Sequence, residues 1–252
     1  MCGLFYFSDM NRLPVVTKNL LAINVLMFLA LVVMETKGID LNDILGLHLF
    51  VSKEFHVYQI VTYMFMHGDL MHLFFNMFAL YMFGRTLEMV WGPKRFLVFY
   101  LVAGVGAALV QEAIGMARYY SLLGSMNPLE VNEVVANGLG ILHQGKNYIA
   151  PALAELNVVI NATTVGASGA IYAILLGFGM LFPNERLFVF PIPFPIKAKF
   201  FVIGYAIIEL YLGTSGAADG VAHFAHLGGM VFGLVMILYW RKQKKIGGPY
   251  VW

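Results

Sequence analysis

The chain has 252 residues, of which 60% are hydrophobic and only 12% are charged, and its mean hydropathy is +0.76. Average soluble domains carry about 25% charged residues, so this composition excludes an ordinary soluble domain and indicates a membrane protein with several spans. The net charge is +2, and no basic tract with interleaved aromatic residues points to nucleic acid. A single cysteine, Cys2, excludes an intramolecular disulfide and a cysteine-based metal cluster.

Six apolar segments have the length that a bilayer requires, about 17 to 25 residues with their flanks. They predict an all-α polytopic membrane protein, a single membrane domain over residues 1–252, with spans at about 13–34, 70–90, 96–113, 167–182, 198–212 and 221–240. The fourth and fifth spans are short. No charged segment with a small-residue cleavage site precedes the first span, so we expect no removable signal peptide.

The positions of the basic residues predict how the chain crosses the membrane. With the amino terminus inside, 12 of the 16 Lys and Arg residues fall on the inner face, and Lys37, Lys53, Arg118 and Lys146 remain outside. Cytoplasmic loops carry such an excess of Lys and Arg. Because the number of spans is even, both termini are predicted to lie in the cytoplasm.

Two outer segments are long. Residues 35–69 mix charges with apolar patches, which predicts short helices lying at the membrane surface. Residues 117–163 contain Asn127 and Pro128, which predict a helix start with the asparagine as cap and the proline at the first position. One interpretation is that both segments only cover the outer surface of the bundle. The other is that they take part in gating or in substrate contact.

The second span begins with the run from His67 to Asn76 and contains His72. Polar side chains are expensive inside a membrane span, so each is a candidate functional residue. His72 and Asn76 are four residues apart and share one helix face. Their imidazole and amide groups could donate to a developing oxyanion, or could only hold the bundle together through interhelical hydrogen bonds. The metal-binding pattern His-Glu-x-x-His does not occur, and neither a metal nor a cofactor is predicted.

The fourth and sixth spans carry matching rows of small residues, which let membrane helices approach closely. The rows are Gly169, Ala173 and Gly177 in the fourth span, and Gly229 and Gly233 in the sixth. We therefore predict that these two helices pack against each other along the rows.

This packing would bring a histidine to a serine. Ser168 lies between Gly166 and Gly169 at the start of the fourth span, and His226 lies three residues before Gly229, on nearly the same face. A general base beside a hydroxyl is the minimal arrangement for activating a serine nucleophile. His223, one turn nearer the outer surface, is predicted to support the site rather than to act as the base.

Taken together, three motifs resemble those of the rhomboid family of intramembrane serine proteases. They are His-x4-His-x3-Asn in the second span, Gly-x-Ser-Gly at the start of the fourth and Ala-His-x-Gly-Gly in the sixth, and they cover nearly the whole chain in the family's order. The resemblance implies a six-helix bundle with a short central helix that bears the serine. It further implies a Ser–His dyad, with no carboxylate, that cleaves transmembrane segments of single-pass or polytopic membrane proteins.

The resemblance also implies roles for individual residues. Ser168 would be the nucleophile, and His226 the general base and acid. The oxyanion hole would consist of His72, Asn76 and the backbone N–H of Ser168. Tyr172 would pack on His226, and His67 would brace the outer end of the second helix.

The sequence also departs from the family pattern. The Trp-Arg pair often found in the first outer loop of rhomboids is absent from residues 35–69, and the connection between the third and fourth spans is longer than usual. A six-span core without a seventh helix is similar to bacterial-type rhomboids, which implies a plasma (inner) membrane location. The oligomeric state is not predicted.

Two other functions remain open at this point. A catalytically inactive relative would bind membrane proteins without cleaving them, but such a protein typically lacks the serine or the histidine, and both are present. A proton-coupled transporter would use Glu209 of the fifth span together with the histidines, but no inverted pair of broken helices is recognisable. Glu209 is instead predicted to hydrogen-bond within the bundle or to the loop that follows it.

Overall fold

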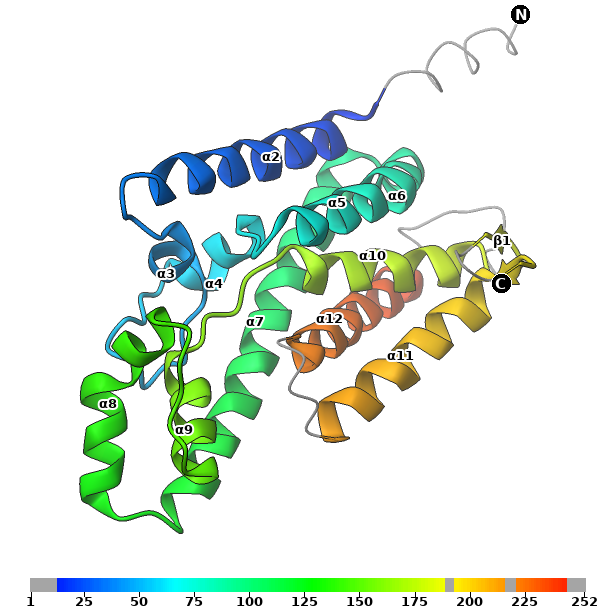
Figure 1. Cartoon of the computed structure of the whole chain (residues 1–252). Helices are drawn as coiled ribbons and strands as arrows, with labels where there is room; N and C mark the ends of the chain where they lie inside the picture. The colour runs from blue at the N-terminus through cyan, green and yellow to red at the C-terminus, as the bar shows by residue number, and fades with distance from the viewer. Residues whose placement is uncertain (1–12, 189–192, 216–220, 244–252) are drawn as a thin grey trace, which may run out of the picture.

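The computed structural model describes residues 13–188, 193–215 and 221–243, so Cys2, Arg12, Lys244 and Lys245 lie outside it. Within these ranges the chain is almost entirely helical (Figure 1). One pair of two-residue antiparallel strands, β1 (Arg186–Leu187) and β2 (Ile196–Lys197), is the exception among the described residues. The prediction of an all-α polytopic protein is confirmed.

Four of the described helices are long and apolar enough to cross a membrane. They are α2 (Val15–Glu35), α7 (Pro93–Leu123), α11 (Ala198–Ser215) and α12 (His223–Lys242). A shorter apolar helix, α10 (Ser168–Leu181), lies among them. The protein is therefore a multi-pass membrane protein. The first, third, fourth, fifth and sixth predicted segments correspond to α2, α7, α10, α11 and α12, in that order.

The second predicted segment is one helix that changes its winding. It consists of α5 (Leu70–Ala79), a π-helical turn η2 (Leu80–Gly84) and α6 (Arg85–Trp91). The backbone keeps right-handed helical angles where the parts join, at Leu80 and at Arg85. The π turn has no signature in the sequence, and such turns are frequent near functional sites.

Helix α7 is longer than the apolar segment that predicted it. We expected a helix over residues 96–113, and the structure continues it to Leu123. The helix does not end at the edge of the apolar run. Its outer part packs against α9 (Pro151–Asn161). The predicted start of the second outer segment, at residue 117, therefore falls inside a helix.

The second outer segment then forms a helical hairpin of α8 (Pro128–His143) and α9, which projects beside the outer end of α7 (Figure 1). Asn127 caps α8 as predicted, since its side chain accepts a hydrogen bond from Leu129 N at 2.9 Å. Glu130 completes a capping box by accepting from Asn127 N at 3.1 Å. The hairpin has its own small apolar core, formed by Val134, Leu156 and Ile160.

The first outer segment contains short helices, as the sequence predicted. They are α3 (Leu41–Leu45), α4 (Gln59–Thr62) and a 3₁₀ turn, η1 (Tyr63–Phe65). Gln59 is fully buried and its side chain donates to the carbonyls of Ile44 and Glu54, which ties the segment together.

Helix α10 occupies the middle of the bundle. It lies between the α5–α6 helix on one side and α11 and α12 on the other (Figure 1), and it also contacts α7. Most of its residues are buried, including Ala173, Ile174 and Gly177. The short central helix that begins at the serine is therefore present.

Candidate active site

The backbone that leads into α10 is held by the first outer segment. Thr164 and Leu47 exchange two backbone hydrogen bonds, of 2.9 and 2.8 Å. Two residues later, Gly166 N donates to Tyr63 O at 2.9 Å. These bonds fix the approach of the chain to Ser168, which is the first residue of α10.

Gly166 adopts a backbone conformation that favours glycine, with φ at +128°. A Cβ atom built there would lie 2.8 Å from Cε1 and Nε2 of His72 and 3.5 Å from Ser168 Oγ. The His72 ring and the Ser168 hydroxyl therefore lie on the same side of this turn. Because Gly166 has no side chain, the space beside it is open to the His72 ring and the Ser168 hydroxyl.

The serine and histidine that the motifs predicted are in contact. Ser168 Oγ lies 2.8 Å from His226 Nε2, a hydrogen-bond distance between the first turns of α10 and α12. His226 is buried and Ser168 is half-buried. The imidazole of His226 and the hydroxyl of Ser168 are thus held together within the bundle.

Close packing of two helices brings this pair together. A Cβ atom at Gly229 would lie 1.9 Å from the carbonyl oxygen of Gly169, and one at Gly233 would lie 2.8 Å from Cβ of Ala173. Helices α10 and α12 therefore touch backbone to backbone near the site, and the predicted matching of the small-residue rows is confirmed for these positions. Further along, a Cβ atom at Gly177 would lie 3.1 Å from side-chain atoms of Leu87 and Trp91 of α6 and 3.6 Å from one of Ile237 of α12.

The imidazole of His226 is also covered by an aromatic ring. Tyr172 stacks on it with a centroid distance of 4.2 Å and an interplanar angle of 6°. Tyr172 lies one turn after Ser168 on α10, so one helix provides both the hydroxyl and the ring that restricts rotation of the imidazole. This placement is the one that the sequence resemblance implied.

The predicted oxyanion donors lie on α5, whose amino terminus is capped by Asp69 through a 2.7 Å bond from His72 N. Asn76 is buried, and its Nδ2 donates to His72 O at 3.0 Å. An amide nitrogen carries two hydrogens, so one donor of Asn76 is not used by this bond. The structure places the His72 ring beside the Ser168 turn and Asn76 one turn further along the same helix face.

His67 lies just before α5, in the first outer segment, and is fully buried. Its ring meets the ring of His72 edge-on, with centroids 5.1 Å apart. Burial lowers the pKa of His67 to about 4, so this histidine is neutral at pH 7. A neutral ring packed against His72 fits the bracing position that was predicted for it.

Glu209 of α11 connects several of these side chains. Its Oε1 accepts a hydrogen bond from the Tyr172 hydroxyl, and its Oε2 lies 2.7 Å from His223 Nδ1. The same Oε2 lies 3.0 Å from Nδ1 of His226. The prediction that Glu209 hydrogen-bonds within the bundle is confirmed, but its position beside His226 was not foreseen, since the family resemblance implied a dyad with no carboxylate.

Glu209, His223 and His226 together offer the atom types of a metal site. Glu209 Oε2 lies 2.7 Å from His223 Nδ1, in a hydrogen bond, and 3.0 Å from His226 Nδ1, in an ion-pair contact. Two tetrahedral ligands of zinc, each about 2.0–2.1 Å from the ion, would lie about 3.3 Å apart. The distances therefore describe direct contacts between these side chains, which link α11 to α12, and the bond from Tyr172 to Glu209 adds α10.

Fold and site together define a multi-pass membrane protein in which a buried histidine contacts a serine at the start of a central helix. The rhomboid domain family matches residues 54–243, well over half of the chain, so the chain belongs to the rhomboid family. The matched region contains the residues of the candidate site from His67 to Gly233.

Relatives with rhomboid names support the same assignment. RHOMBOID-like protein 12, mitochondrial, of Arabidopsis thaliana is 27% identical over 206 residues, which cover 81% of this chain and 51% of the relative. Rhomboid protein 1, mitochondrial, of Saccharomyces cerevisiae is 27% identical over 193 residues, 73% of this chain and 42% of the relative. Rhomboid protease AarA of Providencia stuartii is 28% identical over 181 residues, 70% of this chain and 53% of the relative. The chain thus spans about half the length of the curated relatives it matches.

Proposed function

We propose that the protein is an intramembrane serine endopeptidase that cleaves transmembrane segments of other membrane proteins. The observation that carries this proposal is the 2.8 Å contact between Ser168 Oγ and His226 Nε2 in a chain of the rhomboid family. A serine hydroxyl is a weak nucleophile until a base takes its proton, and an imidazole at hydrogen-bond distance is such a base.

In this proposal, Ser168 Oγ attacks the carbonyl carbon of the scissile peptide while its proton passes to Nε2 of His226. The C–N bond then breaks, and Nε2 returns the proton to the leaving amine, which leaves an ester on Ser168. Water attacks the ester carbon with its proton passing to Nε2. The C–O bond breaks, and the proton restores the Ser168 hydroxyl.

The negative oxygen of each tetrahedral intermediate needs hydrogen-bond donors. The backbone N–H of Ser168 is one, because it belongs to the first turn of α10, where N–H groups have no partner within the helix. The helix dipole adds partial positive charge there. The His72 imidazole and the second amide hydrogen of Asn76 are the side-chain donors that we assign to this oxygen.

The substrate and the location follow from the same proposal. A cavity open to the outer side would supply water, and a substrate helix must unwind locally to expose its peptide bond to Ser168. The protein would lie in a plasma membrane, with both termini in the cytoplasm. Four of its relatives carry mitochondrial names, so a mitochondrial membrane is the alternative that localisation would test.

The deciding experiment is cleavage of a reporter transmembrane segment by the purified protein reconstituted in liposomes. Ser168→Ala and His226→Ala are each expected to abolish cleavage, because each removes one partner of the pair, while expression and folding remain. A serine-reactive phosphonate probe is expected to label the parent protein and not Ser168→Ala.

Two results would speak against the proposal. Undiminished cleavage by Ser168→Ala would show that another group is the nucleophile. A folded parent protein that neither cleaves reporter segments nor reacts with the probe would favour a rhomboid-like factor that binds membrane proteins without cutting them.

A further inference from the structure

We propose that Glu209 is a positioning residue for the general base: it holds His226 in the tautomer that accepts the serine proton and stabilises the charged imidazole that results. This inference rests on the proposed protease function. It assigns to the chain a Ser–His–Glu arrangement in place of the dyad that its motifs implied.

The first support is the place of Glu209 in the bundle. It lies on α11, is 5% exposed, and reaches across to side chains of both α10 and α12. A carboxylate is costly to bury in an apolar span unless its oxygens have partners. Here Oε1 accepts from the Tyr172 hydroxyl and Oε2 accepts from His223 Nδ1 at 2.7 Å. These bonds hold the carboxylate in a fixed position.

The second support is the direction in which the fixed carboxylate points. Its Oε2 lies 3.0 Å from Nδ1 of His226, on the side of the ring opposite the contact between Nε2 and Ser168. An imidazole that accepts a proton at Nε2 must carry its own proton at Nδ1. A carboxylate oxygen beside Nδ1 favours this tautomer, because it attracts the N–H and would repel a lone pair.

The third support is charge. When Nε2 takes the proton of Ser168, the imidazole becomes a cation in a site where His226 is 8% exposed. Such a cation is costly to bury alone, and a carboxylate at contact distance offsets that cost. This is the part that the buried aspartate takes in the Ser-His-Asp triad.

Other groups that face Glu209 support the same arrangement. Tyr172 of α10 serves twice, since its hydroxyl bonds Glu209 and its ring stacks on His226. Tyr205 of α11 lies against the Tyr172 ring, with centroids 6.0 Å apart. His223 of α12 shares Oε2 with His226, and their rings meet edge-on. A single carboxylate therefore orients the ring, the tyrosine that covers it and a second histidine.

The geometry of the contact between Glu209 and His226 determines how far kcat should fall when the carboxylate is removed. At His226 it is an ion-pair contact of 3.0 Å rather than a well-aligned hydrogen bond, and the oxygen is shared with His223. In the triad of serine proteases, replacing the aspartate by asparagine lowers kcat by about 10⁴-fold. We expect a smaller loss here, about 10²-fold.

The test compares Glu209→Gln and Glu209→Asp with the parent protein in the reconstituted cleavage assay. Glu209→Gln keeps the size of the side chain but removes its charge, so kcat should fall about 10²-fold while KM changes less than about 3-fold. Glu209→Asp keeps the charge but shortens the reach, so its kcat should lie between those of Glu209→Gln and the parent, at least 5-fold below the parent. A role in packing alone would not make the charged, shorter side chain the better substitute.

Glu112→Gln is the matched control. Glu112 is also a buried glutamate, on α7, and its Oε2 accepts from Phe50 N at 2.8 Å. Replacing its carboxyl by an amide should lower the melting temperature and leave the kcat of the folded fraction at the parental level. A loss of kcat in Glu112→Gln as large as that in Glu209→Gln would overturn the proposal, because replacing any buried carboxyl by an amide would then have the same effect.

The remaining outcomes also decide the matter. Parental kcat in folded Glu209→Gln overturns the inference. If Glu209→Gln does not fold, Glu209→Asp decides alone: a loss of 5-fold or more with unchanged KM supports the inference, and parental kcat overturns it. Ser168→Ala is measured alongside, because a Ser168→Ala protein that still cleaves would refute the protease function itself, whatever the Glu209 variants do.

Discussion

At the scale of single residues, the proposed active site combines groups that would act on the substrate with groups that only hold others in place. Asn76 shows why the two are hard to separate. Its amide donates to His72 O within its own helix, which is a structural bond, yet a second amide hydrogen remains for a substrate oxygen. Only a measurement that separates the rate of reaction from stability distinguishes these roles.

His72→Ala and Asn76→Ala are each expected to lower kcat by up to about 10²–10³-fold, the usual loss on removing one oxyanion donor. KM should change little, because the bond forms mainly in the transition state. Kinetics of reporter cleavage in liposomes provide the measurement.

The chain offers a matched control for Asn76. Asn24 of α2 is also buried and makes the same type of bond, with its Nδ2 donating to Leu20 O at 2.7 Å. Asn24→Ala should cost stability without a loss of kcat. If Asn76→Ala behaves in the same way as Asn24→Ala, the hydrogen bond within the helix is its whole role.

Sequence motifs identified the side chains of this site, but not all of their partners. The contact of Ser168 with His226 follows from spacing on two helices whose small-residue rows must meet, and the packing of Tyr172 on His226 was implied by the family resemblance. Glu209 was recognisable as a carboxylate in an apolar span. Its contact with His226 depends on how α11 is rotated and how deep it lies, and no pattern in the sequence records either quantity.

At the scale of elements, the contact of α10 with α12 decides whether the site exists. Gly229→Ala would place a Cβ atom 1.9 Å from the carbonyl oxygen of Gly169. Because the atom it meets is backbone, the helices must separate, and overpacking of this kind costs about 1–3 kcal/mol or more. Ser168 and His226 lie on these two helices, so separation would also lengthen their hydrogen bond.

We therefore expect Gly229→Ala to lower both the melting temperature in detergent and the kcat for reporter cleavage. Gly204→Ala is the control, because Gly204 lies inside α11 and a Cβ there would meet nothing within 4 Å. That substitution should leave activity unchanged and stabilise the protein slightly, since alanine has the better helix propensity. Parental stability and activity in Gly229→Ala would contradict the tight packing.

Helix ends were less predictable than helix identity. The predicted segment ended at residue 113, a few residues before Arg118, but a charged residue does not stop a helix. The helix continues to Leu123 and packs against α9. In contrast, the start of α8 was predictable to the residue, because Asn127, Pro128 and Glu130 form a local capping signal.

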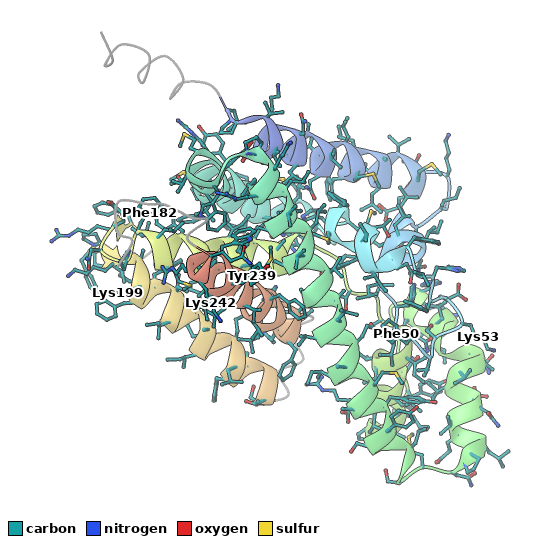
Figure 2. All side chains as sticks on the ribbon, turned by 180° about the vertical axis from the view of Figure 1, so that it is seen from behind. Phe50, Lys53, Phe182, Lys199, Tyr239 and Lys242 are labelled. Atoms are coloured by element: carbon teal, nitrogen blue, oxygen red, sulfur yellow. The ribbon has the colours of Figure 1, made fainter. Side chains whose placement is uncertain are left out.

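At the scale of the whole molecule, the orientation in the membrane is a prediction that assigns the two ends of the bundle to opposite sides. Lys199, assigned to the inner face, lies toward one end of the molecule, and Lys53, assigned to the outer face, lies toward the other (Figure 2). The helical hairpin of α8 and α9 lies at the same end as Lys53 (Figures 1 and 2). Ser168 and His226 lie in the first turns of α10 and α12, which places the site toward the predicted outer side.

The orientation is testable with the protein's own thiol, because Cys2 is its single cysteine. A membrane-impermeant maleimide should leave Cys2 unlabelled in intact cells and label it after permeabilisation, since an excess of Lys and Arg keeps the amino terminus in the cytoplasm. Lys146→Cys in a Cys2→Ser background is the control: residue 146 is exposed in the turn between α8 and α9 and should be labelled without permeabilisation. The reverse pattern would place Ser168 on the inner side and would require substrates to be cleaved from the cytoplasm.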